Sequence, residues 1–229
     1  MKGPGIFSGY YKREDKTAEC FDADGWFMTG DVAQVYPNGS IKIIDRSKNI
    51  FKLSQGEYIA PEKIEQIYTL SQMIAQCFVY GDSLKNCCVS VVFPEQEAVE
   101  AWGQQNGISG DFASLCQNAA LKAEIKKEMD KLGKEKKLSS LEKPKVFILW
   151  TELCSVDNNM LTATFKMKRN VVRDVFRPQI DQMYVEADAM EAARGAAPAN
   201  PAPTGAPATP PAAAPGEPKA SPSSGAAAT

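Results

Sequence analysis

The stretch from Asp24 to Glu65 gathers residue types that could bind a nucleotide. It contains DGWFMTGD and, after a spacer, DRSKNIFKLSQGEYIAPEKIE. An acid, an arginine and two lysines stand at fixed separations around tight glycine turns: Asp31, Arg46, Lys48 and Lys52. A carboxylate accepts hydrogen bonds from two hydroxyls together, and a guanidinium is an always-charged fork that suits phosphates. The arrangement is hard to explain as core packing and indicates a nucleotide site.

The elements that must position these residues follow from local patterns. Two alternating β-prone runs, 32–36 and 40–44, flank Pro37-Asn38-Gly39, and Asn-Gly supplies the positive φ angles of a tight hairpin. A short strand is expected at 50–53. A turn at 54–56 should then lead into a helix.

That helix is expected to begin at Pro61, where the missing N–H costs nothing. Ile64 and Ile67 should share its buried face, and Glu65 should point elsewhere. An antiparallel strand pair is expected at 74–80 and 87–93, followed by helices at 95–105 and 118–137. A third strand is expected at 146–150, and a last helix, interrupted or bent near Pro178, at 170–184. The sum is an α+β domain, a small antiparallel sheet flanked by helices.

Composition excludes several classes of function. The 229 residues carry a formal net charge of −2 and no histidine, so neither a Ser-His-Asp relay nor a His-containing zinc site can be built. The balanced charge gives no field for capturing nucleic acid. Six cysteines without a CxxC pair are interpreted as reduced, mostly buried thiols. With neither a membrane-spanning apolar run nor a signal peptide, we expect a cytoplasmic location or a peripheral one on a cytosolic membrane face, such as the endoplasmic reticulum or the peroxisome.

Four motifs occur in order between Gly3 and Tyr184: GPGIFSGYYK, DGWFMTGD, DRSKNIFKLSQGEYIAPEKIE and LTATFKMKR. In this order the chain resembles the adenylate-forming enzymes and, among them, the long-chain fatty acyl-CoA synthetases. The resemblance implies that a long-chain fatty acid, ATP with Mg²⁺, and coenzyme A react through an acyl adenylate, releasing pyrophosphate and then AMP.

The resemblance also implies roles for single residues. Asp31 matches the ribose-binding aspartate, Arg46 the arginine that contacts ribose and phosphate, and Lys48 the hinge about which the C-terminal domain rotates. Considered without the flanking motifs, Asp31 is interpreted as an ordinary Gly-Asp turn ahead of a strand, and Arg46 and Lys48 as part of a polar loop; the series of motifs reverses this preference.

Two further positions match residues used in the thioester-forming arrangement: Lys52, and Gly56, which leaves space for the coenzyme A arm. Lys166 matches the lysine used in adenylation, where a cation stabilises the negative charge that develops at the α-phosphate. The alternative for Lys166 is membership of an exposed basic cluster with Lys168 and Arg169.

The domain organisation follows from the same comparison. We expect residues 1–45 to be the C-terminal edge of a large AMP-binding domain, with orphan β-strands, and 46–186 to be the C-terminal lid domain. Residues 187–229 should form a disordered Ala/Pro-rich tail. The phosphate loop and fatty-acid tunnel of the family have no counterpart here, so the chain is interpreted as a fragment that is inactive alone. The alternatives are a non-catalytic binding module whose Pro-rich tail recruits partners, and one chain of a split enzyme.

Overall fold

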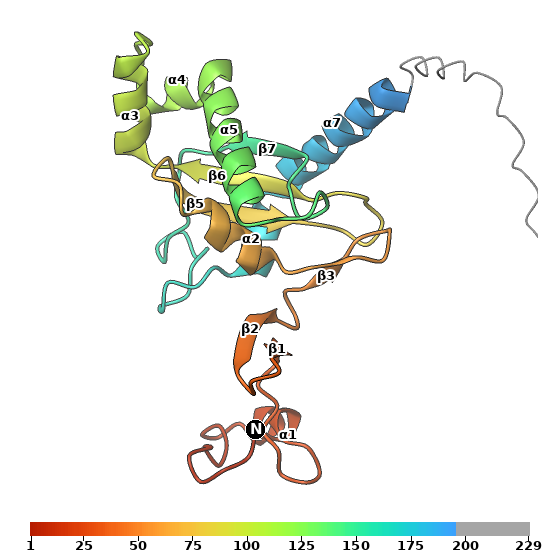
Figure 1. Ribbon diagram of the computed structural model, residues 1–229. Coiled ribbons are helices and arrows are strands. Elements are labelled where there is room, and N and C mark those ends of the chain that lie inside the picture. Colours follow the sequence, from red (N-terminus) through yellow and green to blue (C-terminus); the bar gives the residue numbers. More distant parts are fainter. Residues whose placement is uncertain (196–229) are drawn as a thin grey trace, which may run out of the picture. The chain divides into compact units, whose positions relative to one another are not determined.

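The computed structural model describes residues 1–195, and a three-stranded sheet lies at its centre (Figure 1). The strands are β5 (Ile74–Tyr80), β6 (Val89–Pro94) and β7 (Val146–Leu149), in the order β5-β6-β7. The expected antiparallel pairing of β5 with β6 is confirmed. β7 runs parallel to β6, so the sheet is mixed rather than wholly antiparallel. The parallel strand is possible because a long helical crossover separates β6 from β7.

Helices cover both faces of this sheet. On one face lie α2 (Pro61–Tyr68), α3 (Gln96–Gln105), α4 (Phe112–Cys116) and α5 (Ala119–Glu135). On the other lie α6 (Arg169–Val175) and α7 (Arg177–Gly195). Successive residues of β6 alternate between the two cores, with Val92 in the first and Val91 and Phe93 in the second. A sheet buried on both faces explains why its strands are continuous apolar runs.

The helices begin where the local chemistry predicts. α2 starts at Pro61, and α5 buries the expected stripe of Leu121, Ile125 and Met129. The break before Pro178 falls at Phe176, between α6 and α7. The short helix α4 was not predicted; the Asp111 carboxylate caps it by accepting from the Ser114 N–H at 2.9 Å.

The last helix is longer than the sequence suggests. α7 continues to Gly195, so residues 187–195, assigned to the tail by composition, are helical. Ala187 is buried in the second core, so the buried face of α7 continues about one turn beyond Tyr184. The remainder of the predicted tail, 196–229, lies outside the described residues.

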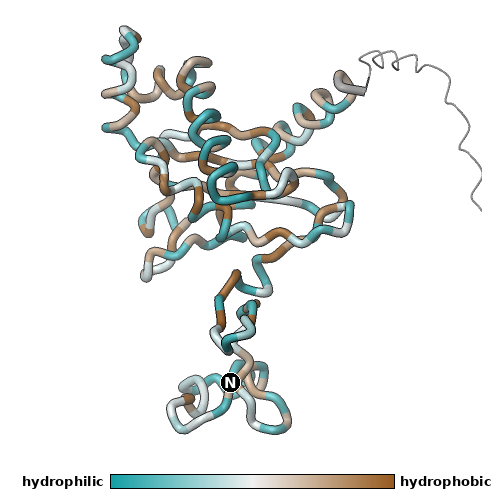
Figure 2. The backbone as a smooth tube through the Cα atoms, in the orientation of Figure 1, coloured by the Kyte–Doolittle hydropathy of each residue, from teal (hydrophilic) through white to brown (hydrophobic). Residues whose placement is uncertain are grey.

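Residues 1–46 contain α1 (Glu14–Cys20), which was not predicted, and the expected hairpin of β1 (Asp31–Val35) and β2 (Ile41–Arg46). Gly39 in its turn has φ +80°. Val35, Ile41 and Ile43 are exposed, and Figure 2 shows hydrophobic residues along β2 as well as in the central sheet. Within residues 1–195 the two strands pair only with each other, as expected for strands separated from a larger sheet.

All six cysteines are free, and all except Cys20 are buried, as expected. None of the helices described is long and apolar enough to cross a membrane.

Candidate functional site

Asp31 and Arg46 stand opposite one another at the open end of the β1–β2 hairpin. Arg46 Nε lies 3.1 Å from Asp31 Oδ1, and Arg46 Nη1 donates to the Thr29 carbonyl at 2.9 Å. Gly30 adopts φ +72°, which turns the chain so that Thr29 and Asp31 both face the guanidinium. The hairpin register therefore brings these two predicted residues together.

The Asp31–Arg46 pair still has polar atoms that can bind a ligand. The Arg46 side chain is 56% exposed, and Asp31 Oδ2 has no hydrogen-bond partner in the described part of the chain. A carboxylate oxygen of this kind can accept from a ribose hydroxyl, and the exposed guanidinium can meet a phosphate. The donor set fits a nucleotide.

Lys48 lies in the turn that directly follows β2, with its side chain exposed. The turn is held by the buried carboxylate of Asp45, which accepts from the Asn49 side chain at 3.3 Å and from the Glu62 N–H at 3.0 Å. Asn49 Nδ2 also donates to Glu62 Oε1 at 2.6 Å. Asp45 thus joins the end of β2, the turn and the first turn of α2. Sequence reasoning placed Asp45 only at the end of a strand and missed this contact.

The segment after the turn is fixed by an aromatic contact. It contains β3 (Phe51–Lys52), which pairs with β4 (Tyr58–Ile59). The Phe51 ring lies against Gly81 just beyond β5, where a Cβ would come within 2.0 Å of a ring carbon. No side chain fits at position 81 unless the ring moves.

Lys52 and Gly56 lie in the β3–β4 hairpin, so this predicted pair is also close together. A Cβ on Gly56 would lie 3.7 Å from Lys52 Cε, and Gly56 has φ +91°. The Lys52 ammonium lies over the Tyr58 ring, 5.5 Å from its centroid. The Lys52 side chain is exposed.

Lys166 belongs to a separate tight loop between Leu161 and Met167, which form an isolated antiparallel bridge. The Thr162 N–H donates to the Lys166 carbonyl at 2.8 Å, and the Lys166 N–H donates to Thr162 Oγ1 at 3.1 Å. Lys166 is exposed. In residues 1–195 it forms no ion pair, and no hydrogen bond joins it to the other predicted residues.

The neighbouring basic residues differ from Lys166. Lys168 Nζ donates to Asn159 Oδ1 at 2.6 Å. Arg169 donates to both Glu65 oxygens at 2.8 Å and to the Val79 carbonyl at 2.6 Å. The three cations therefore do not form one solvated cluster.

The prediction that Glu65 points away from the buried face of α2 is wrong. Glu65 is buried, with 9% of its surface exposed. Its carboxylate also accepts from the Val79 N–H at 2.7 Å, so it joins α2, β5 and α6. Burial raises the pKa of Glu65, although the Arg169 charge and the Val79 N–H oppose the shift. This ion pair anchors the segment that follows the Lys166 loop.

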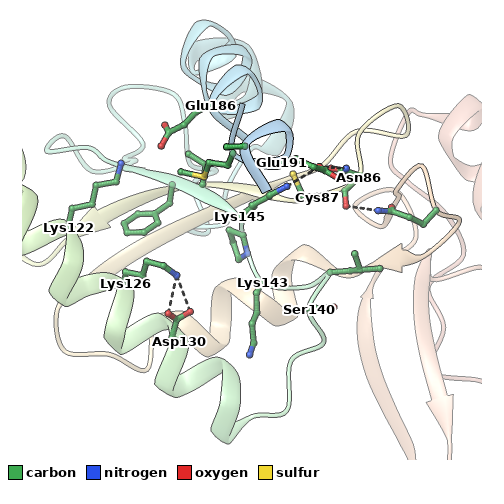
Figure 3. Close-up of a pocket in the computed structure, with 17 residues that line it drawn as sticks. Asn86, Cys87, Lys122, Lys126, Asp130, Ser140, Lys143, Lys145, Glu186 and Glu191 are labelled. Atoms are coloured by element: carbon green, nitrogen blue, oxygen red, sulfur yellow. Dashed lines mark hydrogen bonds and ion pairs between the residues drawn. The ribbon is translucent and has the colours of Figure 1, made fainter. Parts of the chain in front are cut away.

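The predicted residues do not line the cleft between α5, β7 and α7, which has a volume of 810 Å³ (Figure 3). Two of its lysines are already paired: Lys126 with Asp130 and Lys145 with Glu191, both at 3.0 Å. A smaller cavity of 320 Å³ adjoins the turn after β2 and is lined by Lys48, Phe51 and Arg169, among others. No group of three Cys, Asp or Glu side chains placed to hold a metal ion occurs in residues 1–195.

Comparison with known proteins identifies relatives of this chain. It is 50% identical over 184 residues to long-chain-fatty-acid–CoA ligase 1 of Homo sapiens, covering 80% of this chain and 26% of that protein. The chain is homologous to the long-chain fatty acid–CoA ligases. The peroxisomal long chain acyl-CoA synthetase 6 of Arabidopsis thaliana is 45% identical over 192 residues, covering 83% of this chain and 27% of that protein. The chain thus spans about a quarter of the length of these ligases. No family model matches it.

Solved structures agree with this relationship. The adenylation domain of a carboxylate reductase from Mycobacterium chelonae matches with a TM-score of 0.70 and 34% identity, over 80% of this chain and 27% of that one. The A-PCP didomain of carboxylic acid reductase from Segniliparus rugosus, in complex with AMP, matches with a TM-score of 0.70 and 32% identity, over 84% and 25%. The fold of this chain is therefore similar to that of about a quarter of these adenylation-domain structures.

Proposed function

We propose that this chain supplies the C-terminal part of a long-chain fatty acid–CoA ligase. The observation that carries the proposal is the identity of about half the residues over 184 positions to enzymes with that name. Two pairings support it: Asp31 with Arg46, and Lys52 with Gly56. The resemblance assigns the members of each pair to the same step.

In the proposed reaction a carboxylate oxygen of the fatty acid attacks the α-phosphorus of ATP. The bond to pyrophosphate breaks, and an acyl adenylate forms. Asp31 accepts from the ribose hydroxyls, Arg46 binds ribose and phosphate, and the Lys166 ammonium stabilises the charge that develops at the α-phosphate.

In the second step the thiol sulfur of coenzyme A attacks the acyl carbon, the bond from that carbon to the phosphate oxygen breaks, AMP departs, and the thiol proton is released to solvent. A rotation about Lys48 withdraws Lys166 and brings forward Lys52 and Gly56, whose missing side chain leaves room for the coenzyme A arm. Because no acidic cluster in residues 1–195 is arranged for a metal, we propose that Mg²⁺ is held by the nucleotide phosphates and by residues outside this chain.

The proposed location is peripheral, on a cytosolic membrane face such as that of the endoplasmic reticulum or the peroxisome. One relative is named as peroxisomal, which supports the peroxisome as the location. That the Pro-rich tail recruits partners remains a prediction, which rests on its proline content alone.

Fatty-acid-dependent release of pyrophosphate tests the function. We expect it from a full-length enzyme in which this chain follows the N-terminal residues of a long-chain ligase, and we expect none from the 229 residues alone. Release by the isolated chain would contradict the claim that it is incomplete. A full-length enzyme that stays inactive with fatty acids of every length would favour the binding module instead.

A further inference from the structure

Phe165 occupies a position in the Lys166 loop that suits glycine. The Phe165 N–H donates to the Thr162 carbonyl at 2.9 Å, and the Thr162 N–H donates to the Lys166 carbonyl at 2.8 Å. These two bonds enclose a three-residue hairpin loop whose last residue is left-handed, and Phe165 has φ +59°. Glycine is the usual residue there because any Cβ is strained in that conformation.

Packing within this chain does not account for the phenyl ring. Phe165 is 77% exposed and belongs to neither hydrophobic core of the described residues. The other non-glycine residues with positive φ are two lysines and an asparagine: Lys12, Lys137 and Asn159. Phe165 is the one apolar residue of this set within 1–195. A large apolar side chain is therefore kept where it strains the backbone and is mostly exposed to solvent.

The ring is also coupled closely to Lys166. The two residues are adjacent in a loop closed by three hydrogen bonds, and the loop ends at the bridge between Leu161 and Met167, of which Leu161 is buried. Three residues further on, Arg169 is held by Glu65. A contact made by the ring would therefore fix the loop backbone from which the Lys166 side chain projects.

We infer that Phe165 is a positioning residue whose ring packs on an apolar protein surface in the adenylation arrangement and thereby holds the Lys166 ammonium at the reacting phosphate. The surface belongs to the ligase residues outside this chain, which spans only about a quarter of the length of its relatives. Exposed aromatic side chains with few rotatable bonds are typical anchors of such contacts. This inference rests on the proposed function.

The first test needs no activity and uses the 229-residue chain. Phe165→Gly should raise the Tm by about 2–4 °C, because the substitution removes strain and no core packing. The matched control Phe165→Ala removes the ring and keeps the strain, so its Tm should not rise. A Tm for Phe165→Gly at or below that of the unsubstituted chain would overturn the inference, because the ring would then stabilise this chain itself.

The second test uses the full-length enzyme. Phe165→Gly should lower the kcat of pyrophosphate release by about tenfold to 100-fold, as expected when a catalytic group is displaced by about an ångström. The KM for fatty acid should not change, and thioester formation from supplied acyl adenylate should proceed at the normal rate. Phe165→Leu, which keeps an apolar side chain, should retain most of the adenylation rate.

Two outcomes of the second test count against the inference alone. One is full adenylation by Phe165→Gly. The other is a raised KM that depends on fatty acid chain length, which would place the ring against the acyl chain. Failure of the unsubstituted full-length enzyme to release pyrophosphate would instead overturn the proposed function, and the role of Phe165 with it.

Discussion

The Asp31 carboxylate and the Arg46 guanidinium face each other across the β1–β2 hairpin, with Arg46 Nε 3.1 Å from Asp31 Oδ1. Each charge therefore orients the other, and the Thr29 carbonyl fixes the second arm of the arginine. Removal of either group leaves its partner without that orientation.

Substitution at this pair should weaken nucleotide binding. We expect Asp31→Ala and Arg46→Met in the full-length enzyme each to raise the KM for ATP by about tenfold or more, the equivalent of one lost hydrogen bond to a charged group. Lys42→Gln is the matched control, because Lys42 is exposed on the same strand. An unchanged KM for ATP in Asp31→Ala would show that the ribose assignment is wrong.

Substitution of Lys166 and substitution of Lys52 should each slow a different half-reaction. We expect Lys166→Ala to lower fatty-acid-dependent pyrophosphate release by about 10²–10³-fold, because a cation aimed at developing charge is lost. Conversion of supplied acyl adenylate into thioester should continue. Lys52→Ala should show the reverse pattern, and Lys134→Ala, an exposed lysine of α5, should change neither step. If Lys166→Ala slowed both steps equally, its role would be structural.

The Glu65–Arg169 pair should contribute strongly to stability. Arg169→Met leaves a buried carboxylate without its cation and should lower the free energy of unfolding by about 3–5 kcal/mol, measured by urea denaturation of the 229-residue chain. The double variant Glu65→Leu with Arg169→Met should recover only part of this loss, because the unpaired charge is gone but the Val79 N–H loses its acceptor. Arg173→Met is the control, because its pair with Asp174 is exposed and should cost less than about 1 kcal/mol. A loss that small for Arg169→Met would contradict the burial described for Glu65.

The cysteines should differ in reactivity toward iodoacetamide. Burial raises the pKa of Cys77 and Cys88 to about 12, and that of Cys116 and Cys154 to about 11. Burial also raises the pKa of Cys87. Because the thiolate is the reacting species, the folded chain at pH 8 should be alkylated only at Cys20, as read by mass spectrometry of its peptides. Labelling should reach all six cysteines in denaturant; equal labelling of Cys87 and Cys20 in the folded chain would contradict the structure.

Local chemistry explains what the sequence could predict. The Asn38-Gly39 turn fixes the pairing of the hairpin from Val35 to Ala33, but Asp31 comes opposite Arg46 only because a bulge between Val32 and Ala33 shifts the register by one residue. Pro61 marks the start of α2, and one turn holds Lys52 near Gly56. Turn type and spacing are sufficient for the start of α2 and for the Lys52–Gly56 hairpin, but they do not specify the bulge that aligns Asp31 with Arg46.

Contacts between distant segments could not be predicted in this way. Glu65 is buried because Arg169 meets it from another helix, and a charged residue beside Ile64 gives no local sign of that partner. The parallel direction of β7 depends on the path of three helices. The length of α7 depends on the burial of Ala187, which is indistinguishable in the sequence from the alanines of the tail.

The contact between Phe51 and Gly81 determines how motion at the hinge would be transmitted. The ring lies against Gly81 only two residues beyond the turn, and the Asp45 carboxylate bonds Asn49 within the turn, so the segment from Ser47 to Ile50 is held at both ends. In the rotation proposed about Lys48, the Phe51 contact would move the neighbouring Lys52 together with the sheet. The proposed placement of Lys52 would therefore depend on the absence of a single methyl group at position 81.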